Sequence, residues 1–345
     1  MKRITACYVR IFTTLIIITG FLMLSSTKVN AAENIVIVID PGHGGDNLGA
    51  EPGTFYEKDS NLITAKAMKA ELEKYDNVKV YMTREDDKAL TLDERAAFAA
   101  SVHADFLYSL HYNMSLNHYF YGAEVWAQSA GENYTKGYSF GQVLLADFQN
   151  NFGILSRGVK VKVNNRGKDY YGVLRASQAL QIPAVIIEHC HLDNQEDAEF
   201  YATTQTLQDF GKADAVAVAK YFGLTSSVLG TEFKNYAKFI PDIPTSPKIQ
   251  DLTVPEICLA EVIDYDSKTG NLNFKISSED KDSGILYYSY SLDNGTTWSP
   301  LYIWPSAVGT VKISVKSKSS ATPFIIARSF NSYDGMAVSQ SVKYN

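Results

Sequence analysis

Three cysteines and ten prolines among 345 residues are few, and no extended cluster of basic residues occurs in the chain. Cys7 lies close to the N-terminus, and Cys190 and Cys258 are far apart in the sequence, so a disulfide-stabilised scaffold is excluded. Lys and Arg number 32 against 38 Asp and Glu, which makes the net charge −6 at pH 7. An acidic chain without basic clusters is not suited to bind nucleic acid or anionic lipid, so neither is expected as the main partner.

Long apolar runs are also missing, apart from one near the N-terminus. Residues 11–24 form an apolar stretch of about 14 residues, shorter than the roughly 20 that a membrane-spanning helix needs. Basic residues precede this stretch, and the small-residue sequence Val29-Asn30-Ala31 follows it. This order is typical of a signal peptide over residues 1–31 that is cleaved after Ala31. We therefore expect export, and the alternative of an uncleaved membrane anchor is disfavoured by the length of the run.

What the chain does contain, from residue 34 to 224, is an alternation of strand and helix patterns. A continuous β-branched run predicts a strand at 35–39, and largely apolar runs predict strands at 78–82, 106–110 and 184–187. Apolar residues at helical spacing predict helices at 62–75, 91–100, 140–148 and 207–221. Asp59 and Ser60 are candidate N-caps of the first helix, and Thr91 with Glu94 forms a capping box at the second. Strands that alternate with helices indicate an α/β domain with a largely parallel sheet.

The pattern changes after Gly223. Residues 225–252 contain three prolines among polar residues, which predicts a linker. From 253 to 345 no helical period is found, and short alternating strands are separated by turn signals such as Asp293-Asn294-Gly295. This second region is therefore predicted to be a small all-β sandwich, and the chain to have two folded domains.

Chemically reactive side chains recur just beyond the carboxyl ends of the predicted strands, where open α/β sheets collect such groups. His43 follows the first strand within Asp40-Pro41-Gly42-His43-Gly44-Gly45, and the glycines permit a sharp turn that leaves the imidazole uncrowded. Glu57 lies immediately before the first helix, and His111 follows the strand at 106–110. Glu188 follows the strand at 184–187, where an unpaired charge is costly.

Two imidazoles and one carboxylate are the ligand set of a catalytic zinc site, whose fourth position is left for water. His43, Glu57 and His111 are therefore candidate ligands, and imidazole ligation favours zinc over magnesium. Glu188 is the candidate general base that takes a proton from the water and gives it to a leaving amine. Each of the three candidate ligands alone has a simpler interpretation, as a turn histidine, a helix N-terminal acid or a buried histidine, whereas Glu188 is harder to explain in such a way. Their combination favours the metal site.

Several short segments form an ordered series across nearly 190 residues of the chain. They are residues 38–45, 57–62, 82–87 with Leu92 and Arg95, 109–113, and 173–175 with 183–188. In this series, residues 35–223 resemble the zinc-dependent N-acetylmuramoyl-L-alanine amidases, which include autolysins, sporulation and germination amidases and phage lysins.

The resemblance implies a twisted, mixed and largely parallel six-stranded sheet flanked by helices over residues 34–224. It implies that His43, Glu57 and His111 bind zinc and that Glu188 is catalytic. The implied reaction is hydrolysis of the amide bond between N-acetylmuramic acid and L-alanine in peptidoglycan, by an enzyme that is secreted or located at the cell wall.

The chain departs from the family pattern in two places. His189-Cys190-His191 follows the catalytic glutamate, where the family has a small residue, glycine and phenylalanine. Tyr112 and Met114 flank Asn113, where the family has small residues. These positions are expected to line the substrate groove, so the stem-peptide preference stays open.

Three residues are candidates for contact with substrate: Arg175, Asn113 and His189. A thiol nucleophile at Cys190, or a second metal site formed with its neighbouring histidines, is an alternative. It is disfavoured because adjacent residues on a strand point to opposite faces. Arg84 and Arg95 are expected to anchor a loop through carboxylates such as Asp86 and Asp93 rather than to contact peptide.

Residues 282–298 resemble the immunoglobulin-like modules of bacterial surface proteins, which implies an immunoglobulin-like sandwich over 253–345. Tyr302 and Trp304, if exposed, would suit sugar rings as apolar platforms. Two other functions remain open beside amide hydrolysis: a zinc peptidase or deacetylase acting on the cell wall, and a non-catalytic wall-binding protein that has kept the fold.

Overall fold

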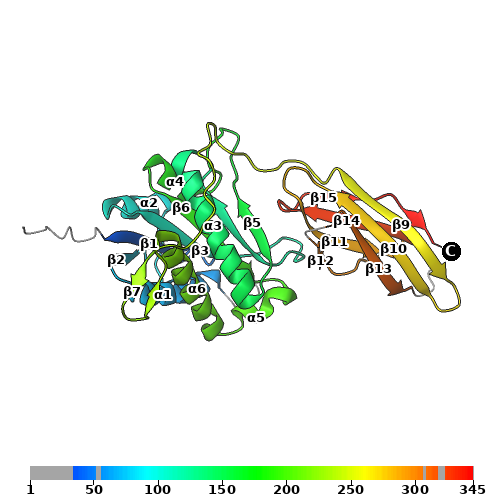
Figure 1. Cartoon of the computed structure of the whole chain (residues 1–345), viewed down its shortest axis with the longest axis horizontal. Helices are drawn as coiled ribbons and strands as arrows, with labels where there is room; N and C mark the ends of the chain where they lie inside the picture. The colour runs from blue at the N-terminus through cyan, green and yellow to red at the C-terminus, as the bar shows by residue number, and fades with distance from the viewer. Residues whose placement is uncertain (1–33, 52–55, 306–307, 318–322, 345) are drawn as a thin grey trace, which may run out of the picture. The chain divides into compact units, whose positions relative to one another are not determined.

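The computed structural model describes residues 34–51, 56–305, 308–317 and 323–344, and the predicted signal peptide lies outside them. Among these residues, no helix combines the length and the apolar character that crossing a bilayer requires. The first part of the described chain is built on a six-stranded sheet with helices (Figure 1). Its strands are β1 (Ile35–Pro41), β2 (Val78–Met82), β3 (Phe106–Asn113), β4 (Ala123–Ala127), β5 (Ser156–Lys160) and β6 (Ala184–His191). Its helices are α1 (Glu57–Leu72), α2 (Leu92–Ser101), α3 (Gly131–Phe152), α4 (Gly172–Ala179), the 3-10 turn η1 (Gln195–Asp197), α5 (Ala198–Tyr201) and α6 (Thr204–Phe222).

The strands are ordered β2-β1-β3-β6-β4-β5 in this sheet. Only the β4–β6 pair is antiparallel, and the other neighbouring pairs of this sheet are parallel. The mixed, largely parallel α/β sheet expected from the sequence is thereby confirmed. Because β1, β3 and β6 are adjacent and parallel, their carboxyl ends lie at one edge of the sheet. The register places His111 of β3 beside Glu188 of β6.

Alternation along β1 explains how both faces of the sheet are covered. Ile37 and Ile39 belong to the core formed with α1, α3 and α6, whereas Val38 belongs to a second core with α2 and α4. All three side chains are fully buried. Such a continuous β-branched run is what a strand buried on both faces requires. Figure 1 shows α1, α3 and α6 grouped together and α2 beside α4.

The two predicted helix starts have different outcomes. The capping box at α2 is confirmed, since Thr91 Oγ1 accepts from the Glu94 backbone N–H at 3.2 Å and Glu94 accepts from the Thr91 N–H at 2.7 Å. The caps predicted for the first helix are wrong. Helix α1 begins at Glu57, and the N–H groups of Asp59 and Ser60 donate to the carbonyl of Tyr56, so both residues lie in the first turn.

Strands β4 and β5 and helix α4 were not predicted. Every residue of β4 is buried, although its second residue is Glu124. A charged residue in a short apolar run is normally taken as exposed, which is why the sequence pattern does not indicate this strand.

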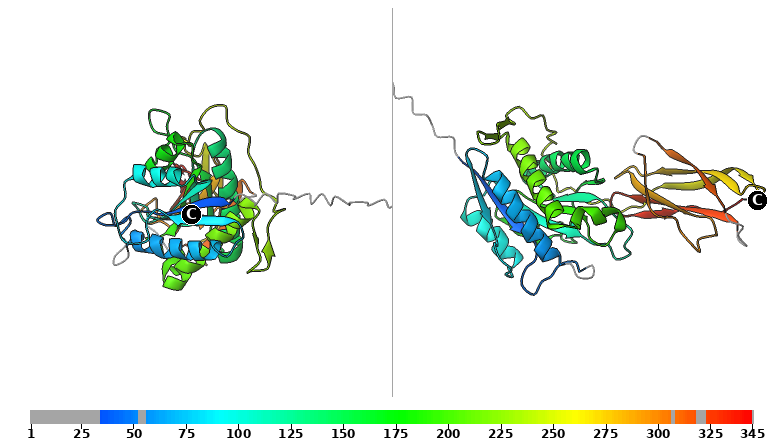
Figure 2. Two further views of the ribbon diagram at one scale, coloured as in Figure 1. Left: turned by 90° about the vertical axis from the view of Figure 1, so that its left-hand side faces the viewer. Right: turned by 90° about the horizontal axis from the view of Figure 1, so that it is seen from below.

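The C-terminal region contains two antiparallel sheets, which Figure 2 shows as two layers of strands. One sheet consists of β9 (Ile257–Asp266), β10 (Asn271–Glu279) and β13 (Thr310–Lys316). The other consists of β11 (Ile285–Ser291), β12 (Tyr302–Ile303), β14 (Phe324–Asn331), β15 (Met336–Val338) and β16 (Val342–Lys343). Leu272, Phe274 and Ile276 of one sheet share a buried core with Ile325 and Ala327 of the other. This packing is consistent with the expected β-sandwich.

The proline-containing segment 225–252 is hydrogen bonded to the helix-and-sheet region. Its first residues form a small hairpin of β7 (Thr225–Ser226) and β8 (Thr231–Glu232). Asp76 donates its N–H to Thr225 O at 2.8 Å, and Lys248 donates its N–H to Ser129 O at 2.8 Å. The segment thus follows the surface of the first region rather than standing free of it.

Candidate metal centre and catalytic glutamate

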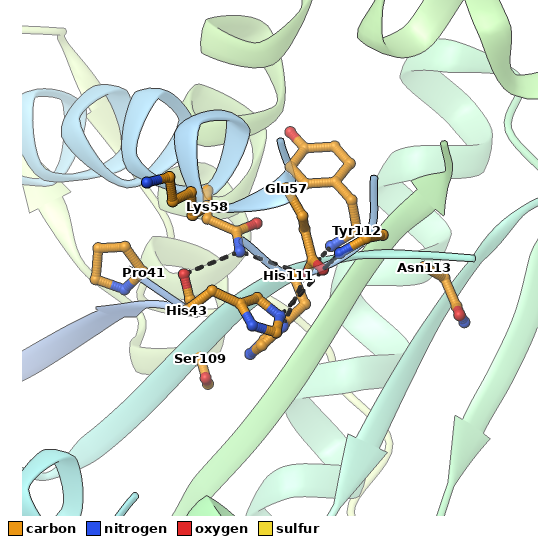
Figure 3. Close-up of polar contacts among 12 residues, drawn as sticks. Pro41, His43, Glu57, Lys58, Ser109, His111, Tyr112 and Asn113 are labelled. Carbon is orange, nitrogen blue, oxygen red and sulfur yellow. Dashed lines mark hydrogen bonds and ion pairs between the residues drawn. The ribbon is translucent and has the colours of Figure 1, made fainter. Parts of the chain in front are cut away.

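His43, Glu57 and His111 come together at the carboxyl edge of the sheet (Figure 3). His43 Nε2 lies 3.0 Å from Glu57 Oε2, and His111 Nδ1 lies 2.9 Å from Glu57 Oε1. One potential ligand atom from each residue lies within 4.8 Å of the others. The three side chains come from the turn after β1, the first residue of α1 and the end of β3.

The backbone bends sharply to bring these side chains together. His43 itself has a φ of 61°, in the left-handed region that few residues other than glycine adopt. A Cβ at Gly42 would lie 2.3 Å from Cε1 of His111. A Cβ at Gly49, whose φ is +76°, would lie 2.5 Å from Glu57 Oε2. Any side chain at either glycine would therefore displace one of the three residues.

Glu57 is the buried centre of the group. The backbone N–H groups of Ala50 and Tyr112 donate to its two carboxylate oxygens at 2.8 and 3.1 Å. Burial alone would raise the pKa of Glu57, but hydrogen bonds from His111 and His43 hold that pKa well below its usual value. The carboxylate is thus ionised, as a metal ligand must be.

The residues present fit a zinc ion. Two ligand atoms of a tetrahedral zinc, each about 2.0–2.1 Å from the metal, are roughly 3.3 Å apart. The two separations between imidazole nitrogen and carboxylate oxygen, 3.0 and 2.9 Å, are close to that distance. Asn47 Oδ1 lies 2.9 Å from His43 Nδ1 and can accept a hydrogen bond from the Nδ1–H tautomer, which leaves the Nε2 lone pair directed at the group.

Two buried arginines hold the turn that carries His43. Arg84 Nη2 donates to Gly42 O at 2.8 Å, and Arg95 Nη2 donates to His43 O at 2.7 Å. Arg95 Nη1 also forms a buried ion pair with Asp40 Oδ1 at 2.6 Å. Both arginines thus anchor a loop, as predicted. The predicted partners are corrected, since backbone carbonyls and a strand carboxylate take the place of the loop carboxylates.

Glu188 lies on β6 beside the ligand strand, in register with His111. Its Oε2 atom is buried and has no hydrogen-bond partner among the described residues. Burial raises the pKa of Glu188 well above its usual value, and the negative charges of Glu57 and Glu124 raise it further. A carboxyl group with a raised pKa beside a metal-binding group is suited to accept a proton and return it.

Two of the predicted substrate-contacting residues are held by protein contacts. Asn113 lies apart from the three converging side chains in Figure 3, and its Nδ2 donates to Glu124 Oε1 at 3.0 Å. Arg175 is exposed on α4, and its Nη1 donates to the carbonyls of Asp169 and Tyr170 at 2.8 Å. Arg175 therefore orders the preceding loop, while part of its guanidinium stays at the surface.

His189 is fully buried, which overturns the expectation that it contacts substrate. Its Nδ1 lies 2.9 Å from the carbonyl oxygen of His111, and its Nε2 lies 2.9 Å from Asp214 Oδ2. Its ring stacks on Tyr112 at a centroid distance of 4.9 Å. The unusual residues at 112 and 189 thus pack behind the ligand strand. Cys190 is buried too, and burial raises its thiol pKa, which argues against a thiol nucleophile.

A second buried charge cluster, centred on Glu124 of β4, was not predicted. Arg157 Nε and Lys160 Nζ of β5 both donate to Glu124 Oε2, at 2.8 and 2.6 Å. Burial alone would raise the pKa of Glu124, but the charges of Lys160 and Arg157 hold it well below its usual value. A glutamate inside the apolar run 123–127 was the sequence signal that could have revealed the cluster.

A model of the N-acetylmuramoyl-L-alanine amidase family matches residues 37–220, more than half of the chain. The chain belongs to this amidase family. The match includes the three converging residues, Glu188 and the whole six-stranded sheet except the first two residues of β1.

Relatives of this amidase chain carry corresponding names. The chain is 29% identical to the N-acetylmuramoyl-L-alanine amidase CwlM of Bacillus licheniformis over 195 residues. The aligned region covers 56% of this chain and 71% of CwlM. The chain is 33% identical over 173 residues to the probable cell wall amidase LytH of Staphylococcus aureus, which covers 49% of this chain and 52% of LytH. Against AmiC of Escherichia coli O6:H1, the identity is 27% over 227 residues, and the chain spans 53% of that protein.

A solved structure agrees with the fold of the amidase region. Cwp6 from Clostridium difficile aligns with a TM-score of 0.52 and 30% sequence identity, covering 56% of this chain and 30% of Cwp6. The similarity therefore concerns part of each protein.

Proposed function

We propose that this protein is a zinc-dependent N-acetylmuramoyl-L-alanine amidase that hydrolyses the bond between N-acetylmuramic acid and L-alanine in peptidoglycan. The observation that carries the proposal is the convergence of His43, Glu57 and His111 beside Glu188, inside the region that matches the amidase family. The names of relatives such as CwlM and LytH support peptidoglycan as the substrate.

The roles of the residues follow from their chemistry. Bound zinc would supply a water of lowered pKa and would polarise the substrate carbonyl. His43, Glu57 and His111 would hold the metal and leave one position open. Glu188 takes the proton of the attacking water and passes it to the amine of L-alanine as the amide bond breaks. Burial raises the pKa of Glu188, which favours uptake of the proton from water and its transfer to the amine.

The remaining assignments belong to the same proposal. The protein is exported by a signal peptide over residues 1–31 and acts at the cell wall. The catalytic domain covers 34–224, the connecting segment 225–252, and an immunoglobulin-like domain 253–345. Trp304, which was expected to form a sugar platform if exposed, is only 5% exposed and donates through Nε1 to Val308 O at 2.8 Å. That part of the expectation is withdrawn.

Glu188→Gln tests the proposal most directly. We expect this substitution to lower kcat on purified peptidoglycan by about 100-fold or more, because it removes the proton acceptor. The zinc content, measured after dialysis, should remain that of the parent, since Glu188 is not a ligand. The exposed Glu199→Gln on α5 is the matched control and should leave both quantities unchanged. His43→Ala should instead lose the metal together with the activity.

Mass spectrometry of the digest distinguishes the proposed reaction from its alternatives. Free muramoyl carboxyl groups and L-alanine amino termini are expected. Cleavage inside the peptide would indicate a peptidase, and loss of acetyl groups would indicate a deacetylase. An unaltered wall, in the presence of bound zinc, would indicate a wall-binding protein.

A further inference from the structure

The Glu124 cluster has no role in the proposed mechanism, yet it adjoins the catalytic strand. Strands β4 and β6 are antiparallel, and their register pairs Glu124 directly with Glu188. Directly opposite residues on neighbouring strands project from the same face, with Cβ atoms roughly 4.5–5.5 Å apart. Two carboxylates so placed repel each other unless one of them is neutralised.

Arg157 and Lys160 supply that neutralisation. Both side chains are buried, with 1% and 2% of their surfaces exposed, and both donate to Glu124 Oε2. Glu124 Oε1 accepts a hydrogen bond from Asn113 Nδ2, and Asn113 lies on β3 two residues after the candidate ligand His111. The carboxylate therefore links β5 to the end of β3 as well as facing β6.

Arg157 is itself held by the C-terminal β region. Its Nη1 donates to the hydroxyl of Tyr287 on β11 at 2.8 Å, and its Nη2 donates to Asp334 Oδ1 at 2.7 Å. Tyr287 is fully buried, and its hydroxyl also donates to the carbonyl of Tyr121. All three nitrogens of the buried Arg157 guanidinium thus donate hydrogen bonds. One donates to Glu124 on β4, and the other two donate to residues of the C-terminal β region.

Apolar contacts surround this ionic connection. Phe120 and Tyr121, just before β4, form one buried cluster with Tyr287 and Phe330 of the β region. The guanidinium of Arg157 lies over the ring of Phe120 at 5.2 Å. In such low-dielectric surroundings, an ionic contact is strong, and loss of one partner is costly.

We propose that Asp334, Tyr287 and Arg157 are positioning residues for amide hydrolysis, through which the C-terminal region holds Glu124 and thereby the catalytic strand β6. The C-terminal region then contributes to catalysis by positioning β6, in addition to any role in attachment to the wall. This inference rests on the proposed function, because its kinetic test measures hydrolysis.

Asp334→Asn and Tyr287→Phe in the full-length chain test the inference. Asp334 is the safer position, since its side chain is 39% exposed and its loss leaves no buried anion. On a soluble N-acetylmuramoyl-L-alanyl peptide, each variant should lower kcat by roughly 3- to 30-fold with KM unchanged. Zinc content should be unchanged, and Asp334→Glu, which restores the carboxylate, should recover part of the loss.

Tyr344→Phe is the matched control. Tyr344 is buried in the same β region, and its hydroxyl bonds with Ser317 Oγ at 2.7 Å and donates to Leu292 O at 2.8 Å, both within that region. The Tyr344→Phe variant loses a buried hydroxyl, as Tyr287→Phe does, and its kcat should equal that of the parent. Urea unfolding of all variants shows that each is folded under assay conditions.

Hydrogen exchange gives a readout that needs no activity. Amide exchange in β4 and β6, followed by mass spectrometry, should become faster in Asp334→Asn and Tyr287→Phe than in Tyr344→Phe. If exchange and kcat both match the control, and only binding to whole peptidoglycan falls, the inference is overturned. If the parent fails to cleave the soluble peptide, the proposed function fails, while the exchange comparison still decides whether the C-terminal region holds β6.

Discussion

Two glutamates are buried at the edge of the sheet, and the protein stabilises them in different ways. Glu57 is 4% exposed and Glu124 is 2% exposed. Each has a pKa well below its usual value, although burial alone would raise it. The partners of Glu57 are two imidazoles, whereas those of Glu124 are a guanidinium and an ammonium group.

Because of these different partners, the Glu57 group can exchange a proton for a metal ion, whereas the Glu124 group cannot. An imidazole can lose its proton and then bind a metal, whereas Arg keeps its charge at all accessible pH values. The side chains of His43 and His111 are 22% and 19% exposed, so an ion and a substrate can reach them. Arg157 and Lys160 are closed to solvent. The Glu57 group is therefore suited to metal chemistry and the Glu124 group to permanent support.

The largest effect expected from this comparison concerns stability. Glu124→Gln should lower the free energy of unfolding by about 3–5 kcal/mol, because it leaves the buried Lys160 without its anion and removes one of the two carboxylates that pair with the buried Arg157. Glu57→Gln should cost clearly less in the metal-free protein, since its imidazole partners can become neutral. Urea unfolding at pH 7.5 in the presence of a chelator measures both. Equal losses would contradict the distinction between the two groups.

A smaller effect should appear in the pH dependence of stability. Burial and the charge of Arg157 lower the pKa of the buried His191 to about 3, from an ordinary value near 6.5. The unfolded chain therefore binds this proton first, so stability is complete above pH 6.5 and falls as pH decreases towards 3. Between pH 7.5 and 4.5, His191→Asn should lose less stability than the parent, as measured by the urea midpoint.

His43 should show the opposite sign in the metal-free protein. Burial alone would lower its pKa, but the hydrogen bond and charge of Glu57 raise it above 6.5. The stability from this pair is present below pH 6.5 and is lost as pH rises through the folded pKa. Asp197, whose burial raises its pKa to about 6, keeps the backbone N–H donors of His191 and Gly122 in both variants. Parallel pH profiles for His191→Asn and His43→Asn would be inconsistent with this account.

The smallest expected effect concerns the N-cap of α2, which lies outside the Glu57 and Glu124 groups. Its contribution to the free energy of unfolding gives a reference for theirs. Thr91→Ala removes the N-cap of α2 and should cost about 1 kcal/mol of unfolding free energy, with zinc content and kcat unchanged. Thr91→Ser, which keeps the hydroxyl, should recover most of that loss. A cost close to that of Glu124→Gln would mean that the buried ionic cluster contributes no more than an exposed cap.

Much of the first region could be predicted because its signals are local. The β-branched run at 35–39, the capping box at Thr91 and the helical spacing at 207–221 depend on neighbouring residues, and the structure contains the corresponding elements. The groups at His43 and His111 could be foreseen because strand ends of a parallel sheet meet at one edge.

Other features depend on contacts between distant segments. β4 runs antiparallel to β6, and its Glu124 is buried only because Arg157 and Lys160 lie on the adjacent β5. His189 was expected in the groove, but the pairing of β3 with β6 turns its ring towards Asp214 and Tyr112 behind the sheet. No local pattern around these residues carries that information.

The sequence by itself determined the class of the first region, the identity of the three converging residues and the position of Glu188, because spacing and strand-end placement are properties of the chain. The tertiary structure alone decided how these groups are supported. The link from Asp334 through Arg157 to Glu124 joins residues far apart in the chain. Such a link exists only where folding brings distant residues together and removes Arg157 and Glu124 from water.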